Sequence, residues 1–103
     1  MLVQLIADIH GDLAALEAAL ARGKSLGAER LVCLGDVVDA FQRNRKNTAC
    51  VERIAAAKPW IWIIGNHDRW LAAASRKIGI ADADDDGPAP LPIGLAAMVA
   101  NLP

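Results

Sequence analysis

Short apolar runs alternate with helical patterns along most of the chain. The apolar runs are too short and too continuous for helices, and they predict strands at residues 2–7, 30–34 and 60–64. Patterns with helical spacing follow them, at residues 13–26, 48–57 and 69–77. The order β-α-β-α-β-α predicts an α/β fold with a parallel sheet, because strands joined by single helices are normally parallel with right-handed crossovers.

The same pattern indicates which side chains are buried. The run from Leu2 to Ala7 is almost continuously apolar, which is typical of a strand covered on both faces. In the third helical pattern Trp70, Leu71 and Ala74 are expected on the buried side. The three tryptophans are therefore interpreted as packing residues rather than as a platform for stacking bases.

Turn and cap residues delimit the first two predicted helices. Asp12 is a candidate cap for the first helix, and Asn47 or Thr48 for the second. Gly27 is expected to end the first helix, and Lys58 with the proline after it to end the second.

The pattern changes after residue 80, which suggests a division into residues 1–80 and 81–103. An acidic and proline-rich linker is predicted first, followed by a short apolar helix at about 94–101. The stretch from Asp82 to Gly87 resembles the opening of a calcium loop. Prolines follow it and the required glutamate is absent at the twelfth position, so an acidic linker is the preferred interpretation.

Composition excludes several classes of protein. With 11 basic and 12 acidic residues the net charge is -1, which predicts no clear nucleic-acid surface. No apolar run approaches the roughly 18 residues of a membrane span, and the start lacks a basic signal-peptide region. Cys33 and Cys50 belong to no CxxC pair and are predicted to be free, buried thiols. A cytoplasmic protein without a membrane partner is expected.

Polar side chains follow each predicted strand directly. Asp8 and His10 follow the first, Asp36 the second, and Asn66 and His67 the third. Because the carboxyl ends of parallel strands meet at one edge of a sheet, these side chains are expected to converge on one crevice. Oxygen and imidazole ligands without a thiolate suit manganese, iron or zinc rather than a structural zinc site.

Such a cluster suits phosphoryl transfer. Two metal ions about 3.5–4 Å apart can hold a phosphoryl group and activate a water molecule. Asp36 lies on the middle strand and is the natural bridge between two ions. His67 is then available to protonate a leaving oxygen or to stabilise developing charge.

Three segments also carry a family resemblance. The segments 8–10, 35–39 and 65–68 resemble, in order and spacing, the D-x-H, GD-x-x-D and GNH-[DE] motifs of calcineurin-like metallophosphoesterases. The resemblance covers about residues 1–80 and implies half of the family's α/β sandwich. It implies Asp8 and His10 on one metal ion, Asp36 between two, Asn66 on the second ion and on phosphate, and His67 as the catalytic histidine. Two divalent ions (Mn, Fe, Zn or Ni, with Mn favoured) and a phosphate-ester or nucleotide substrate follow from it.

The resemblance is incomplete. Members of the family carry a further histidine and a GH-x-H motif downstream, whereas this chain contains only His10 and His67. An amino-terminal part of the family domain, a truncated reading frame or a degenerate member is expected, so the dinuclear centre is expected to be incomplete in this chain. The loop from Ala40 to Arg43 lacks the Gly and Arg of GD-x-VDRG, which argues against a protein Ser/Thr phosphatase. The phosphodiesterase-like and diadenosine-tetraphosphatase-like branches both stay open.

Several alternatives remain beside this hypothesis. The chain is alternatively a non-catalytic interaction module, since a retromer subunit resembles the fold and binds partners with it. Asp39 is interpreted as a loop-stabilising residue. Arg43, Arg45 and Lys46 fit a solvated loop, with Arg43 a further candidate for contacting substrate phosphate. A three-stranded sheet left uncovered on one face or edge predicts self-association.

Overall fold

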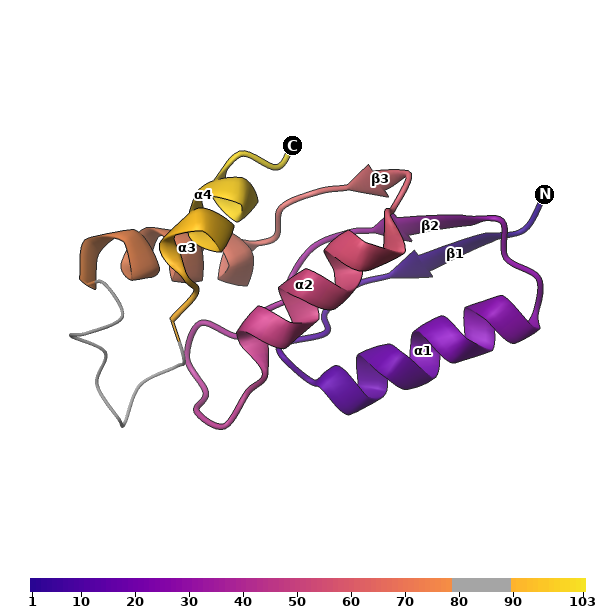
Figure 1. Ribbon diagram of the computed structural model, residues 1–103, viewed down its shortest axis with the longest axis horizontal. Helices are drawn as coiled ribbons and strands as arrows, with labels where there is room; N and C mark the ends of the chain where they lie inside the picture. Colours follow the sequence, from indigo (N-terminus) through magenta and orange to yellow (C-terminus); the bar gives the residue numbers. More distant parts are fainter. Residues whose placement is uncertain (79–89) are drawn as a thin grey trace.

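The computed structural model describes residues 1–78 and 90–103. Within these residues the elements follow in the order β1 (Val3–Ile6), α1 (Leu13–Ser25), β2 (Arg30–Cys33), α2 (Asn47–Ala57), β3 (Ile61–Trp62), α3 (Asn66–Ile78) and α4 (Ile93–Ala100) (Figure 1). The strands form one parallel sheet in the order β1-β2-β3. The predicted α/β class with a parallel sheet is confirmed.

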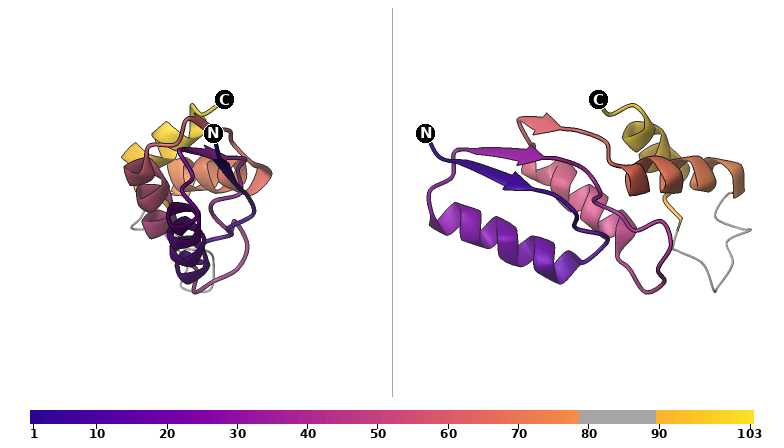
Figure 2. Two further views of the ribbon diagram at one scale, coloured as in Figure 1. Left: turned by 90° about the vertical axis from the view of Figure 1, so that its right-hand side faces the viewer. Right: turned by 180° about the vertical axis from the view of Figure 1, so that it is seen from behind.

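The two faces of the sheet have different surroundings. Helices α1 and α2 lie on the same side of the strands, and the view from behind shows the strands in front of them (Figure 2). Ile6 and Cys33 are paired in register and buried on the helical side. On the other side Leu5 is 64% exposed and Ile61 is 45% exposed. The prediction that the first strand is covered on both faces is therefore wrong, because no described helix lies over this side.

Helices α3 and α4 pack against each other beyond the carboxyl ends of the strands, giving an elongated molecule of 45 × 25 × 19 Å (Figure 1). Leu71 on α3 and Val99 on α4 belong to the same buried cluster as Ile6 of the sheet. The Ser75 hydroxyl accepts a hydrogen bond from the Leu91 N–H (2.9 Å). One core thus joins the sheet to the last helix.

The first helix begins and ends as predicted. Asp12 caps α1, and its carboxylate accepts a hydrogen bond from the Ala15 N–H (3.0 Å). Gly27 follows the helix with a φ of +81°.

The second helix ends as predicted, because Lys58 ends α2 in the left-handed conformation. The predicted N-terminal cap of α2 is wrong, because Lys46 occupies the cap position and its side chain makes no capping hydrogen bond. The side chain of Asn47 binds the backbone of Asp39 instead.

Helix α3 differs most from its prediction. It begins at Asn66 rather than near Arg69, so the polar residues after β3 form its first turn. Leu71 is buried, whereas Trp70 is 48% exposed, so the prediction that Trp70 lies on the buried side of the helix is wrong.

Among the described residues no helix has the length and apolar character needed to cross a bilayer. The acidic stretch of residues 82–87 lies outside the described residues.

Candidate metal centre

The loops after β1 and β2 run side by side and hold the predicted ligands. Hydrogen bonds continue past the strands, from the His10 N–H to the Asp36 carbonyl (2.9 Å) and from the Asp8 N–H to the Gly35 carbonyl (3.1 Å). Asp8, His10 and Asp36 all have positive φ values, of 57°, 52° and 55°. This conformation is unfavourable for residues other than glycine and persists where surrounding contacts hold it, which is common at functional sites.

Three of the predicted ligands come together. Ligand atoms of Asp8, His10 and Asp36 all lie within 4.8 Å of one another. The Nε2 atom of His10 is 3.6 Å from Oδ1 of Asp8. Two donors on one ion are separated by at most about 4.2 Å when each bond is about 2.1 Å long, so a small side-chain adjustment lets the group surround an ion. Two carboxylates and an imidazole fit a divalent transition metal.

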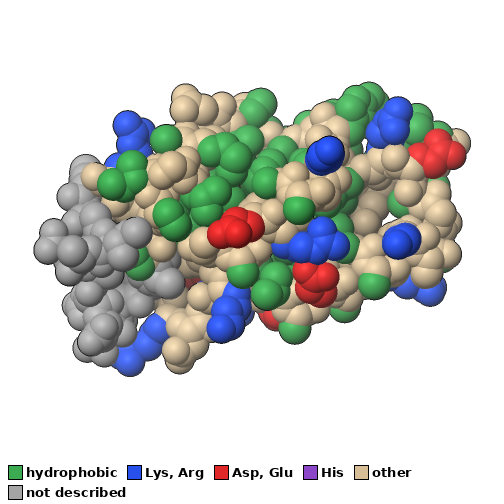
Figure 3. All heavy atoms as spheres, viewed as in Figure 1, with side chains coloured by type: hydrophobic (Ala, Val, Ile, Leu, Met, Phe, Trp, Pro, Cys, Tyr) green, Lys and Arg blue, Asp and Glu red, His purple; other side chains and the backbone are tan. Residues whose placement is uncertain are grey.

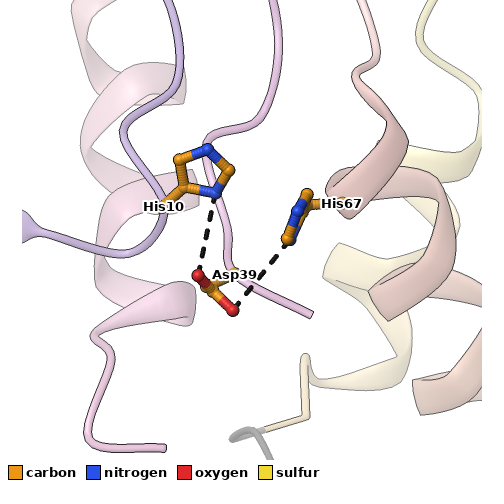
Figure 4. Close-up of side chains that lie close together, drawn as sticks. All are labelled: His10, Asp39 and His67. Atoms are coloured by element: carbon orange, nitrogen blue, oxygen red, sulfur yellow. Dashed lines mark ion pairs between the residues drawn. The ribbon is translucent and has the colours of Figure 1, made fainter. Parts of the chain in front are cut away.

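Asp39 joins this group to His67 (Figure 4). Its carboxylate oxygens lie 3.7 Å from Nδ1 of His10 and 4.0 Å from Nδ1 of His67. The two imidazole rings meet edge to face, with centroids 4.6 Å apart. Nδ1 of His10 is buried and has no hydrogen-bond partner among the described residues. A carboxylate facing the second nitrogen of an imidazole is the arrangement that orients metal-binding histidines.

Asp39 also holds its own loop, as its interpretation predicts. Its Oδ1 atom accepts hydrogen bonds from the backbone N–H groups of Phe41 (2.8 Å) and Gln42 (2.7 Å). Burial opposes ionisation of this carboxyl, but these two hydrogen bonds and the nearby His67 and His10 outweigh burial and lower its pKa. Asp39 is therefore a buried anion that stabilises the loop and faces both histidines.

The first turn of α3 is anchored to the metal-site loop by its own acidic residue. Asp68 is almost fully buried, and its carboxylate accepts hydrogen bonds from the N–H groups of Asp36 (2.8 Å), Val38 (3.1 Å) and Gly65 (3.0 Å). Burial raises the pKa of Asp68. In return the Asp36 carboxylate accepts the N–H of His67 (2.9 Å). The loop after β2 and the first turn of α3 therefore hold each other in place through these hydrogen bonds.

Glycine makes this close approach possible. A Cβ on Gly35 would lie 2.6 Å from the backbone nitrogen of Gly65, and a Cβ on Gly65 would collide with Asp36. Gly35 also has a φ of +100°. Any larger residue at either position would push the metal-site loop away from the start of α3.

The hydrogen bonding of His67 defines its tautomer. Its Nδ1 atom accepts a hydrogen bond from the backbone N–H of Ala40 (3.0 Å). An imidazole nitrogen that accepts carries no proton, so the neutral ring holds its proton on Nε2. His67 can therefore offer its Nε2–H as a hydrogen-bond donor to a bound group.

The two remaining predicted residues, Asn66 and Arg43, are both exposed. Asn66 precedes His67 in the first turn of α3 and is exposed. Arg43 is exposed on the loop between β2 and α2. Reasoning from sequence did not assign Asp68 a role, although an acidic residue in the first turn of a helix is a recognisable capping signal.

Comparisons with known proteins agree with this geometry. The family model of the calcineurin-like phosphoesterases matches residues 1–95, and the chain belongs to this family. It is 30% identical, with a TM-score of 0.68, to the crystal structure of a metallophosphoesterase from Sphaerobacter thermophilus. That match covers 98% of this chain and 41% of the other. An uncharacterized protein of Methanocaldococcus jannaschii, MJ0912, is 37% identical over 67 residues, which are 65% of this chain and 26% of that protein.

These findings establish the family and the fold. The family acts on phosphate esters with divalent metal ions, and the described His and Asp groups are of a kind that binds such ions. The chain spans about two-fifths of the solved relative and about a quarter of the curated one.

Proposed function

We propose that this chain contributes to the metal-dependent hydrolysis of phosphate esters, with phosphomonoesters, phosphodiesters and nucleotide anhydrides as the candidate substrates. The observation that carries the proposal is the group of Asp8, His10 and Asp36, whose ligand atoms lie within 4.8 Å of one another. These residues would hold one divalent ion, and Asp36 with Asn66 would contribute to a second. The bound ions, with manganese favoured, would polarise the phosphoryl oxygens and lower the pKa of a bound water.

The protein's own residues would position the substrate and stabilise charge that develops on it. His67 would donate a hydrogen bond from Nε2–H to the leaving oxygen and stabilise its developing negative charge, because the Ala40 N–H occupies the lone pair of Nδ1. Asp39 would orient His10 through the Nδ1 atom that faces its carboxylate. Asn66, exposed in the first turn of α3, would contribute to binding phosphate, since the positive end of a helix dipole attracts anions. The N–H groups of Gly65 and His67 are already donated to Asp68 and Asp36.

Replacing Asp36 with Asn tests the proposal at the residue that would contribute to both ions. Asn keeps an oxygen that accepts the His67 N–H, so the fold should be retained while the ligand charge is lost. Manganese affinity measured by calorimetry should fall at least about 10-fold, and hydrolysis of p-nitrophenyl phosphate should fall with it. The matched control is Asp12→Asn, since Asn also caps helices and Asp12 lies outside the ligand group. Equal manganese affinity in wild type and Asp36→Asn would disprove the metal site.

A non-catalytic interaction module is the second candidate. The exposure of Leu5 and Ile61 on one face of the sheet favours it, because apolar side chains on a sheet face are common at interfaces. The absence of any manganese binding, together with a stable complex with a protein partner, would support this alternative over hydrolysis.

A further inference from the structure

Two exposed aromatic side chains stand beside His67. The ring centroid of Phe41 is 5.2 Å from that of His67, and the centroid of Trp70 is 5.4 Å from it. Phe41 and Trp70 also contact each other, with centroids 5.5 Å apart and planes tilted by 41°. They come from different elements, the loop after β2 and helix α3. Together they form an aromatic surface that begins at the candidate catalytic histidine.

Neither aromatic side chain is buried in the hydrophobic core. Phe41 is 68% exposed and Trp70 is 48% exposed, whereas the neighbouring Leu71 is 2% exposed. The backbone at Phe41 is nevertheless held in place, because its N–H donates to the buried Asp39 carboxylate. Exposed rings on an ordered backbone lose little further freedom on binding a ligand, which favours affinity.

We propose that Phe41 and Trp70 form a stacking subsite for a planar aromatic group of the phosphate ester, an aryl group or a nucleobase. The inference rests on the proposed function and assigns it a substrate class. If the Nε2–H of His67 donates a hydrogen bond to the leaving oxygen, the group attached to that oxygen lies next to His67, where the two rings begin. Rings in contact have centroids about 4.5–7 Å apart, so the 5.5 Å between Phe41 and Trp70 leaves no room between them and the ligand stacks on an outer face.

The charge of the same loop favours an anionic occupant. Arg43, Arg45 and Lys46 follow Phe41 within five residues, and the loop carries no acidic residue after Asp39. The guanidinium of Arg45 donates from Nε to the Gln42 side-chain oxygen (3.1 Å) and is thereby held on this loop. An aromatic phosphate suits both the stacking rings and a basic loop, whereas an uncharged apolar partner suits only the rings.

The test compares phenylphosphonate with methylphosphonate, neither of which has an ester bond to hydrolyse. Calorimetry on the manganese-loaded chain should show phenylphosphonate binding more tightly by roughly 5- to 30-fold, the effect of stacking one ring. The double variant Phe41→Leu/Trp70→Leu keeps the sites apolar and should reduce that preference below about 2-fold. Trp60→Leu is the matched control, because Trp60 is 61% exposed at the opposite end of β3 and should leave the preference unchanged.

A second pair of ligands identifies the source of the ring. Adenosine 5′-monophosphate binding more tightly than ribose 5-phosphate indicates a nucleobase, and a preference confined to phenylphosphonate indicates a simple aryl group. Equal affinity for phenylphosphonate and methylphosphonate in the wild type overturns the subsite and leaves the proposed function standing. Absence of binding by both phosphonates to the manganese-loaded chain overturns the proposed function and the subsite with it.

Two further outcomes also contradict the subsite. One is an undiminished preference in the double variant Phe41→Leu/Trp70→Leu. The other is a change from dimer to monomer in that variant by sedimentation, which would make the aromatic surface an interface between two copies of the chain.

Discussion

The carboxylate of Asp68 accepts a hydrogen bond from the backbone N–H of Asp36 at 2.8 Å, across 32 residues of sequence. It accepts two more from Val38 and Gly65, and the Asp36 carboxylate accepts the N–H of His67 in return. Asp36, the candidate metal bridge, and His67, the candidate catalytic histidine, are therefore positioned by the same buried carboxylate.

Replacing Asp68 with Asn should destabilise the fold and loosen the metal site. An amide presents an NH2 group where the carboxylate receives backbone N–H groups, so at least one buried donor loses its partner. We expect a loss of about 2–3 kcal/mol in the free energy of unfolding, measured by urea titration. Glu52→Gln on the exposed face of α2 is the control and should change it by less than about 0.5 kcal/mol. An Asp68→Asn variant as stable as the wild type would show that these hydrogen bonds contribute nothing net.

Replacing His67 with Asn should separate its structural contact from its chemistry. The Asn oxygen can still accept the Ala40 N–H, but the proton on Nε2 is lost. Removing one hydrogen-bond donor to developing charge costs about 10²- to 10³-fold, and least when the leaving group is already a good one. The variant should therefore lose much more activity on an alkyl phosphate than on p-nitrophenyl phosphate. Equal losses on both esters would contradict a role in stabilising charge on the leaving oxygen.

The tautomer of His67 can be measured directly by ¹⁵N NMR spectroscopy. In the wild type the ¹⁵N chemical shift of Nδ1 should be that of an unprotonated ring nitrogen, and Nε2 should carry the proton. The reverse assignment would remove the basis for a hydrogen bond donated from Nε2 to the leaving oxygen.

The two cysteine thiols should make stability fall at alkaline pH. Cys33 and Cys50 are free and fully buried, which confirms their prediction, and burial raises the pKa of each from 9.0 to about 11. Below about pH 9 the thiols are protonated in both states. Between about pH 9 and 11 the unfolded chain releases protons that the folded chain retains, so stability is lost as pH rises, by about 2–3 kcal/mol per thiol.

Urea titrations across this pH range measure the effect. The double variant Cys33→Ala/Cys50→Ala should lose less stability than the wild type over the same interval, although it starts lower because of the cavities left. If the free energy of unfolding depended on pH equally in both proteins, the thiols would not contribute to the loss of stability at alkaline pH.

The open face of the sheet should drive self-association. Leu5 and Ile61 flank Val32 in register and are exposed on the open side of the sheet. Figure 3 shows the opposite, helical side, where further hydrophobic side chains gather over α4 and form a separate apolar surface. Leu5→Thr/Ile61→Thr keeps residues suited to strands and removes apolar area, so the double variant should sediment as a smaller species at high concentration. Leu26→Thr, at an exposed site outside the sheet, is the control. A wild-type chain that stays monomeric at all concentrations would contradict the prediction.

Local interactions explain the parts of the fold that were predictable. Asp12 and Gly27 bound α1 through contacts within a few residues, so composition and spacing identify them. The parallel order of strands follows from single helices between them, and it brings Asp8, His10 and Asp36 to one edge, as expected. The start of α3 was missed because its first turn is capped by contacts with a distant loop.

The sequence by itself determined the order of elements, the polar residues at the strand ends and the family, because each depends on residues close together in the chain or on a motif. Only the tertiary structure decided that Asp39 lies between two histidines, that Asp68 joins two loops, and that Leu5 and Trp70 are exposed. Burial and hydrogen bonding of these side chains depend on which segments meet in space. Apolar patterning cannot specify this when the partner segments are tens of residues away.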